Sequence, residues 1–289
     1  MSANGVFQNH PAVAVYSRRT AKLIRACLLL ACICPGPAMT ASAADYKAGY
    51  MAYQGGDFAA AAEEWRALAD AGHTKAQYNV GILFDQGKGV PRDRAEAVRW
   101  WRRAAEGGFR QAQHNLANAY IAGDGVAQNY VDAVYWLEHA AEAGLTRSRY
   151  TLGKIYHYGL GVTADVKRAV ILYQAAAEAG LDKAQYNLAK AYRDGNGVAQ
   201  DHALSVEWFR RAAEQGYAKA QGHLATRYAK GQGVAADPVE AFKWMSLAAR
   251  QGYMTAQENL HVLKARLTPV QRAEGMQRAS DFAAVREGG

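Results

Sequence analysis

The chain repeats itself at a fixed interval. Glycine recurs every 36 residues without an insertion, at Gly72, Gly108, Gly144, Gly180, Gly216 and Gly252. A constant period of this size is the signature of a solenoid, because a unit so short buries its apolar face only against its neighbours. The period therefore constrains the fold more tightly than any local motif in the sequence.

Apolar and aromatic positions keep the register of the glycines. In the fourth copy, Ala184, Leu188 and Tyr192 are spaced four residues apart, as on one face of an α-helix. Asp201 is a natural N-cap for a second helix, and Gly216 suits the left-handed conformation that follows a helix end. Each unit is therefore predicted to be a helical hairpin, and the chain an all-α, right-handed solenoid of helix-turn-helix repeats.

The repeat also resembles a known family. The stretch AQYNLAKAYRDGNGVAQDHALSVEWFRRAAEQG is similar to a Sel1-like repeat, a relative of the tetratricopeptide repeat, and five copies of 36 residues cover residues 72–252. Residues 45–71 resemble a tetratricopeptide-type capping hairpin. Residues 253–283 are interpreted as C-terminal capping helices and residues 284–289 as a flexible tail. End units that depart from the consensus are expected to act as caps.

Residues 1–44 are predicted to be a cleavable signal peptide. Basic residues precede a short apolar run, Ala26–Cys34, and small residues follow at Ala41 and Ala43. The run is too short to span a bilayer, and this order of segments is typical of a secretory leader. Cleavage is expected near Ala43 or Ala44, so the protein is predicted to be periplasmic or secreted, with no stable transmembrane segment.

Cysteine usage bears on the export route. All three cysteines, Cys27, Cys32 and Cys34, lie in the leader, so the mature chain has none and is held by packing alone. LLAC ending at Cys32 weakly resembles a lipoprotein box, but Leu30 is unfavourable before the small residue. SRRTAK resembles a twin-arginine signal without the apolar residues expected next. The choice between the Sec and Tat routes therefore stays open, as does the true start of the chain.

The charge excess falls by half when the leader is removed. The formal charge is +8, and residues 1–44 contain four of the 34 basic residues and no acid, which leaves 30 basic against 26 acidic residues. A remainder of +4 argues only weakly for nucleic acid. A nucleic-acid partner is therefore not predicted.

The glycine-rich loop YRDGNGVAQD carries no ligand chemistry. A calcium loop starting at Asp194 needs a glutamate at its twelfth position, which here is Ser205. A P-loop follows a strand and continues through Gly-Lys-Ser/Thr, whereas these glycines follow a predicted helix. Gly195 and Gly197 are therefore expected to reverse the chain in a conformation that favours glycine.

Catalytic motifs are missing from the sequence as well. It contains no GxSxG, no HExxH, no serine heading an SxxK, and no histidine pair three or four residues apart. A carboxylate that recurs at one register of the second helix is interpreted as a solvated face: Glu106, Glu142, Glu178 and Glu214. The chain is predicted to be no enzyme and to hold no cofactor and no metal.

The positions that vary between repeats on the first helix form the predicted binding surface. In tetratricopeptide arrays, which the chain resembles, this part of the helix lines a concave groove that receives a peptide. Asparagine can bond a peptide backbone, lysine and arginine can pair acids, and tyrosine supplies flat contact area. The predicted partner-binding groove consists of Lys75, Tyr78, Asn79, Asn115, Arg147, Tyr150, Lys154, Lys183, Tyr186, Asn187, Lys190, Arg193 and Lys219. The predicted partner is a protein or an extended acidic peptide.

Structural readings of the same residues stay open. The asparagine of AQYNL belongs to the repeat consensus and can brace a neighbouring loop. The tyrosines can pack between repeats, and the lysines can simply keep the surface soluble.

The predicted function is that of a non-catalytic, exported interaction scaffold or regulator in a bacterial envelope. Proteins that the chain resembles serve as adaptors in exopolysaccharide assembly, as periplasmic regulators of sensor kinases or as secreted factors that engage host proteins. The alternative is an envelope enzyme or carbohydrate-binding module for peptidoglycan or β-lactams, with Tyr150, Tyr158 and Tyr186 stacking on sugars. Some cysteine-rich relatives have been linked with β-lactams, but their paired cysteines have no counterpart here. The sequence predicts no oligomeric state.

Overall fold

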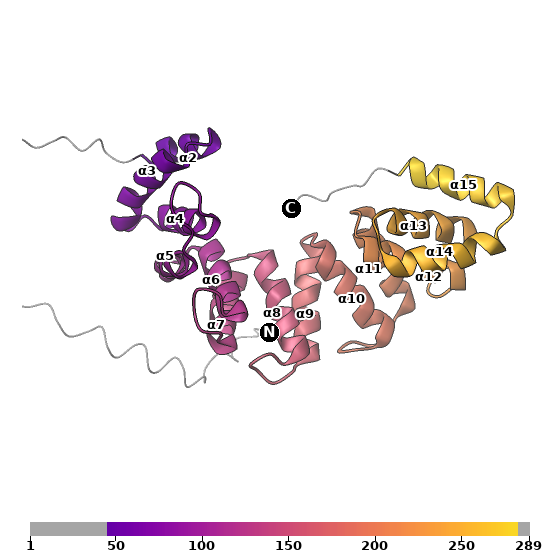
Figure 1. Cartoon of the computed structure of the whole chain (residues 1–289). Helices are drawn as coiled ribbons and strands as arrows, with labels where there is room; N and C mark the ends of the chain where they lie inside the picture. Colours follow the sequence, from indigo (N-terminus) through magenta and orange to yellow (C-terminus); the bar gives the residue numbers. More distant parts are fainter. Residues whose placement is uncertain (1–44, 283–289) are drawn as a thin grey trace, which may run out of the picture. The chain divides into compact units, whose positions relative to one another are not determined.

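The 36-residue period is built as a strict alternation of two helices (Figure 1). The computed structural model describes residues 45–282, and every regular element among them is an α-helix. The helices are α2 (Tyr46–Gln54), α3 (Phe58–Asp70), α4 (Thr74–Gln86), α5 (Arg94–Glu106), α6 (Arg110–Ala122), α7 (Tyr130–Glu142), α8 (Thr146–Tyr158), α9 (Val166–Glu178), α10 (Asp182–Asp194), α11 (His202–Glu214), α12 (Ala218–Lys230), α13 (Pro238–Arg250), α14 (Met254–Arg266) and α15 (Pro269–Ser280). This succession confirms the predicted all-α solenoid of helix-turn-helix repeats.

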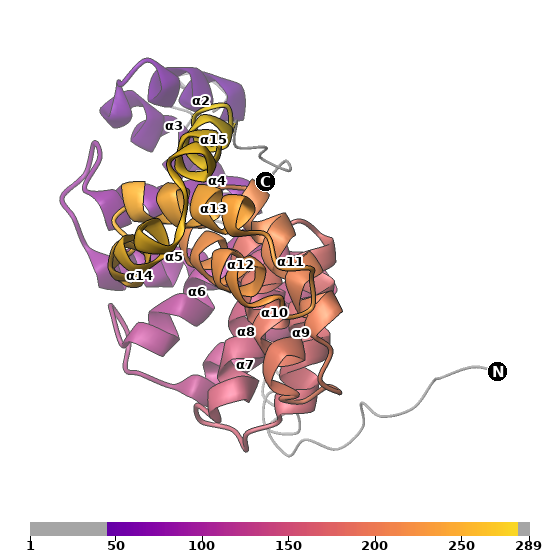
Figure 2. The same cartoon turned by 90° about the vertical axis from the view of Figure 1, so that its right-hand side faces the viewer.

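Each repeat contributes a helix A and a helix B. Helices A are α4, α6, α8, α10 and α12, and helices B are α5, α7, α9, α11 and α13. Each helix A packs against helix B of its own repeat and also against the helix that precedes it in the chain. Figure 2 shows the same succession of hairpins from a second side. The core is therefore continuous from one repeat to the next.

The loop YRDGNGVAQD has the structural role predicted for it. Gly195 ends α10 at φ 66° and Gly197 has φ 76°, in the left-handed region that favours glycine. A Cβ on Gly197 would lie 2.7 Å from the carbonyl oxygen of Val166, so the close approach of α9 in the preceding repeat also requires glycine there. The Asp201 side chain accepts hydrogen bonds from two backbone N–H groups in the first turn of α11.

Two adjacent positions of helix B hold large apolar side chains in every repeat. The first register contains Trp100, Trp136, Leu172, Trp208 and Trp244. The following position is buried in every repeat and holds Trp101, Leu137, Tyr173, Phe209 and Met245. Guanidinium groups cover the rings of the first register, with Arg103 4.4 Å from the Trp100 centroid and Arg211 4.7 Å from that of Trp208. The first register therefore lies at the rim of the core and the second at its centre.

Buried glutamines join successive hairpins, a feature that the sequence analysis did not predict. In four repeats, a glutamine in the first turn of helix A donates from its side-chain amide to a carbonyl eight residues earlier, in the preceding helix. These residues are Gln77, Gln113, Gln185 and Gln221. Gln185 is fully buried, and its Nε2 lies 3.1 Å from the Ala177 carbonyl oxygen. Gln257 makes the same bond from an exposed position.

Two predicted segments lie outside the described residues. The signal peptide over 1–44, including its cleavage site and Cys32, remains a prediction, as does the tail over 284–289. Between residues 45 and 282, no helix is both long enough and apolar enough to cross a membrane.

Candidate partner-binding site

Asparagines of the predicted groove hydrogen-bond to tyrosines of the preceding hairpin. A tyrosine near the start of one hairpin meets an asparagine in helix A of the next. The pairs are Tyr46 with Asn79, Tyr78 with Asn115, and Tyr150 with Asn187. Asn79 Nδ2 donates to the Tyr46 hydroxyl at 2.8 Å. Because these polar groups serve the stack, the charged side chains are the stronger candidates for recognition.

Tyr186 lies in an aromatic cluster between two repeats. Its ring centroid is 5.2 Å from that of Tyr217 and 5.8 Å from that of Phe209. Burial raises the pKa of the Tyr186 hydroxyl to about 12. The hydroxyl therefore remains protonated at neutral pH and meets His223 of α12, where the aromatic cluster borders a group of cations.

Five predicted groove cations are exposed and spread over four repeats: Lys75, Arg147, Lys154, Lys183 and Lys219. Lys75 Nζ lies 4.8 Å from the Tyr46 ring centroid. Among the described residues, none of the five forms an ion pair with a carboxylate. They give the surface positive charge without forming a defined site on their own.

A defined site forms where α10 faces α12. Lys190 and Arg193 extend from α10, and His223 and Arg227 extend from α12; we call these four residues the cationic cluster. Arg193 Nη1 lies 3.4 Å from His223 Nδ1, and the Tyr186 hydroxyl lies 3.3 Å from His223 Nε2. Since a guanidinium only donates, Nδ1 is the acceptor and Nε2 carries the proton that points to Tyr186.

The environment of His223 keeps its ring neutral. Burial lowers its pKa most, and the positive charges of Arg193, Arg227 and Lys190 lower it further, to about 4. The ring stacks on Phe209 with its centroid 5.1 Å away and the planes 9° apart. At neutral pH the cluster therefore contains three fixed cations around an uncharged imidazole.

One carboxylate balances these three cations. Asp194 accepts from Arg193 Nε at 2.6 Å and from Nη2 at 2.7 Å. This bidentate hydrogen bond lowers the pKa of Asp194, so its carboxylate stays ionised at neutral pH. Arg193 is thus occupied, and Lys190 and Arg227 are left to attract a further anion.

Arg227 stands at a register that is apolar in the other repeats. The equivalent residues Leu83, Ala119, Ile155 and Ala191 are all buried. Arg227 Nη1 donates to Gln232 at 2.6 Å, but its buried Nε has no hydrogen-bond partner in the part of the chain that the structure describes. Burial also lowers the pKa of this guanidinium. A buried donor without an acceptor is costly, which makes Arg227 a candidate recognition residue.

The predicted site and the observed cluster overlap in part. Lys190 and Arg193 belong to both, and the predicted residue Tyr186 contacts His223 of the cluster. His223 and Arg227 were not among the predicted groove residues. The signal for Arg227 is present in the sequence as a charge at an otherwise apolar register. Over residues 45–282, no group of three or more histidine, cysteine, aspartate or glutamate side chains is placed to hold a metal ion.

Hairpins of fixed length, glycine-ended helices A and a charged helix A face define a helical-repeat interaction protein. The model of the Sel1 repeat matches five consecutive units, residues 74–109, 110–145, 146–181, 182–217 and 218–253. These units cover more than half of the chain, which therefore belongs to the Sel1 repeat family. The matched units begin two residues after the predicted start at Gly72. Proteins of this family are generally scaffolds that bind other proteins.

Two solved structures share this fold. A protective antigen of uropathogenic Escherichia coli is 31% identical, with a TM-score of 0.76, over 82% of this chain and 52% of the antigen. A Sel1 repeat protein from Oxalobacter formigenes is 30% identical, with a TM-score of 0.72, over 86% of this chain and all of that protein. The chain thus spans about half the length of the antigen.

A shorter similarity links the chain to a curated mammalian protein. DAP3-binding cell death enhancer 1 of Rattus norvegicus and Mus musculus is 48% identical over 42 residues. That match covers 14% of this chain and 8% of the mammalian protein. It spans little more than one repeat and therefore reflects the shared repeat.

Proposed function

We propose that this protein is an exported, non-catalytic scaffold that binds a carboxylate-bearing segment of a partner protein at the cationic cluster. The observation that carries the proposal is Arg227, a partly buried cation whose buried Nε–H has no partner among the described residues, at a register where the other repeats place apolar residues. Retaining such a group is costly to the fold, and a bound carboxylate would offset that cost.

The chemistry of the cluster suits a carboxylate. Hydrogen bonds from lysine or arginine to a carboxylate are shorter and stronger than bonds between neutral groups. Lys190 and Arg227 supply the free charge, and Asp194 keeps Arg193 in place. Tyr158, whose ring is 63% exposed, offers flat contact area beside the partner's chain. The other predicted groove residues, such as Lys183 and Lys219, would extend this surface along the partner.

The binding proposal is tested with a captured partner. Affinity capture from the envelope fraction, followed by mass spectrometry, identifies candidates, and calorimetry then measures their affinity for purified protein. Combining Lys190→Glu with Arg227→Gln is expected to weaken binding at least ten-fold and to reduce its salt dependence. The matched control is Lys230→Glu, an exposed residue near the end of α12. Equal affinity of the double variant and the wild type would remove the cluster from the site.

Export is tested separately, because it depends on residues 1–44. Cell fractionation of the full chain and of a form lacking the leader is expected to place only the full chain outside the cytoplasm. Recovery of both forms in the cytoplasm would refute export without touching the binding proposal.

A second candidate function rests on Tyr158. Its exposed ring packs edge-on against His157, with centroids 4.7 Å apart, and an exposed aromatic face of this kind can stack on a sugar. Pelleting with peptidoglycan that is lost in Tyr158→Ala, or hydrolysis of nitrocefin, would favour the carbohydrate or enzyme alternative. Neither activity is expected if the protein acts as a scaffold.

A further inference from the structure

The last three helices enclose an open groove that lies apart from the cationic cluster. We call it the C-terminal groove; it has a volume of about 440 Å³. Its floor is α13, one wall is α14 and the other is α15. Apolar contact comes from Phe242, Leu260 and Met276, and positive charge comes from Arg250, Lys264 and Arg272.

The groove exists because α15 packs on α13 instead of pairing with α14. In each Sel1 repeat, helix A packs closely against its own helix B, but α14 and α15 make little contact, and each lies against α13. Figures 1 and 2 both show α15 beside α13. In the repeats, one face of helix A packs against its own helix B. The corresponding face of α14 therefore has no helix packed against it.

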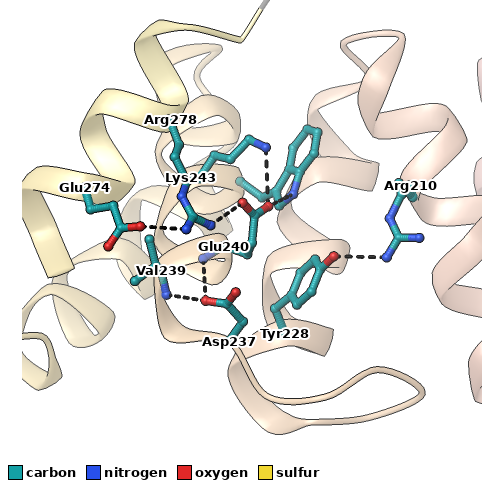
Figure 3. Close-up of polar contacts among 9 residues, drawn as sticks. Arg210, Tyr228, Asp237, Val239, Glu240, Lys243, Glu274 and Arg278 are labelled. Carbon is teal, nitrogen blue, oxygen red and sulfur yellow. Dashed lines mark hydrogen bonds and ion pairs between the residues drawn. The ribbon is translucent and has the colours of Figure 1, made fainter.

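Ionic and hydrogen bonds fix α15 in this position. Arg278 Nη1 donates to Glu240 Oε1 at 2.8 Å, and Trp244 Nε1 donates to the other oxygen of the same carboxylate at 3.0 Å (Figure 3). Lys243 Nζ lies 3.3 Å from Glu240, and Arg278 Nη2 donates to Glu274 at 2.6 Å. Lys243 and Arg278 therefore share the Glu240 carboxylate of α13. The bond from Arg278 holds α15 on that helix.

Apolar packing gives α15 the same position. A Cβ on Gly275 would lie 2.9 Å from Phe242 Cδ1, so the backbone of α15 lies directly on that ring. The Phe282 ring meets the Trp244 ring edge-on, with centroids 5.1 Å apart. The groove is therefore a built feature of this end of the chain.

The exposure of Leu260 shows that α14 lacks a helix B. It stands in register with Leu188 and Leu224, which are fully buried, yet it is only half-buried on α14. Large exposed apolar side chains also lie on α14 and α15, among them Met254, Val262 and the lining residue Met276. An unpaired helix face with exposed apolar groups beside it is typical of a docking site.

The charge of the residues that line the C-terminal groove indicates the kind of partner that it binds. Three cations and no carboxylate line the groove. We propose that the C-terminal groove binds an amphipathic helix of a partner protein, with apolar side chains at i, i+3 or i+4 and i+7 and acidic residues along both flanks. This helix would take the place of the helix B that α14 lacks. The proposal is independent of the cationic cluster.

The probe is a synthetic helical peptide with leucine at i, i+3 and i+7 and glutamate on both flanks, and a matched peptide has lysine in place of glutamate. Fluorescence anisotropy with the purified protein is expected to show binding of the acidic peptide and at least ten-fold weaker binding of the basic one. Met276→Lys is expected to weaken the acidic peptide at least ten-fold. Val270→Lys is the control, because it lies on the same helix, is 75% exposed and is not part of the lining.

A second pair of variants addresses charge without touching the apolar floor. Lys264→Gln with Arg272→Gln is expected to weaken the acidic peptide about five-fold and to flatten its salt dependence. Arg266→Gln, at the end of α14 and outside the lining, is expected to change affinity less than two-fold. Thermal melts of all variants distinguish a loss of binding from a loss of folding. If Met276→Lys fails to fold, the charge variants alone test the proposal.

Several outcomes overturn the proposal. These are equal binding of the two peptides, binding of neither, and equal effects of Met276→Lys and Val270→Lys. Dimerisation that Met276→Lys abolishes would assign the groove to a second copy of the chain. Flotation with phosphatidylglycerol vesicles that depends on Met276 would assign it to a lipid surface. Binding at the cationic cluster is measured with its own variants, so failure of one surface does not imply failure of the other.

Discussion

Acidification from pH 7 to pH 4 is expected to destabilise the fold through His223. Its imidazole has an ordinary pKa of 6.5 in the unfolded chain and a pKa of about 4 in the folded one. Below pH 6.5 the unfolded chain therefore binds a proton at His223 that the folded chain does not bind. Stability falls as the pH drops from about 6.5 to about 4, and His223 has no effect above that window.

The magnitude follows from the two pKa values. Because one pKa unit corresponds to about 1.4 kcal/mol, the difference between 6.5 and about 4 sets a ceiling of about 3 kcal/mol on this loss. Since domain stabilities are typically about 5–15 kcal/mol, a loss of this size is readily measured.

The assay compares the wild type with His223→Gln, which retains polar atoms but does not titrate. Urea unfolding at pH 7, 6, 5 and 4.5 gives the free energy of unfolding of both proteins. Both proteins have the same carboxylates, so the carboxylate contribution cancels when the two free energies are subtracted. The wild type is expected to lose more stability between pH 6.5 and 4.5 than the variant. NMR titration of the His223 ring checks the cause directly. A folded-state pKa of 6 or above, or parallel pH profiles, would refute the reasoning. A carboxylate bound at the cluster is expected to raise this pKa.

Three substitutions test other features. Arg227→Leu restores the apolar register and removes a partly buried cation with an unpaired N–H, so it is expected to raise the melting temperature by a few degrees while it weakens partner binding. Gly197→Val places a Cβ at φ 76° and against the Val166 carbonyl, and is expected to cost about 2 kcal/mol or more by thermal denaturation. Gln185→Leu leaves the Ala177 carbonyl without its buried donor and is expected to cost about 1–3 kcal/mol in urea unfolding.

Matched controls exist for two of these changes. Gly108 also has a positive φ of 82°, but nothing lies within 4 Å of its added Cβ, so Gly108→Val measures the backbone cost alone. An equal loss in both glycine variants would exclude the close approach as a cause. Gln257 makes the same bond as Gln185 from an exposed position, and Gln257→Leu is expected to cost less. For Arg227→Leu, a lower melting temperature would contradict the register argument.

Repetition made the hairpins predictable. Helix ends depend on local chemistry. Gly195 and Gly197 have glycine equivalents in every copy, and Asp201 has an aspartate or asparagine N-cap in every copy, so each unit supported the interpretation of the others. The centre of the core was harder to place. Adjacent apolar residues such as Trp100 and Trp101 differ by only 100° around a helix, and periodicity alone does not separate the rim from the centre.

The repeat pattern did not predict features that occur in only one copy. Arg227 interrupts an apolar register in a single copy, and averaging over copies hides it. The position of α15 depends on Arg278 reaching Glu240 across 38 residues, a contact for which no other copy supplies a template. The charged side chains of the predicted groove were identified as exposed positions, but their grouping around His223 depends on how α10 and α12 pack.

The glycine loops recur every 36 residues, and the glutamine bonds recur in four of the five repeats, so removal or duplication of one whole period keeps the spacing of the remaining joints. Joining the loop that ends α6 to the segment that follows α8 would give each remaining glutamine a carbonyl eight residues before it, as before. Recombination between copies would thus change the length of the protein in steps of one repeat and keep the same kind of joint between helices. Copy number can vary in descendants of this gene while the cationic cluster and the C-terminal groove are inherited unchanged.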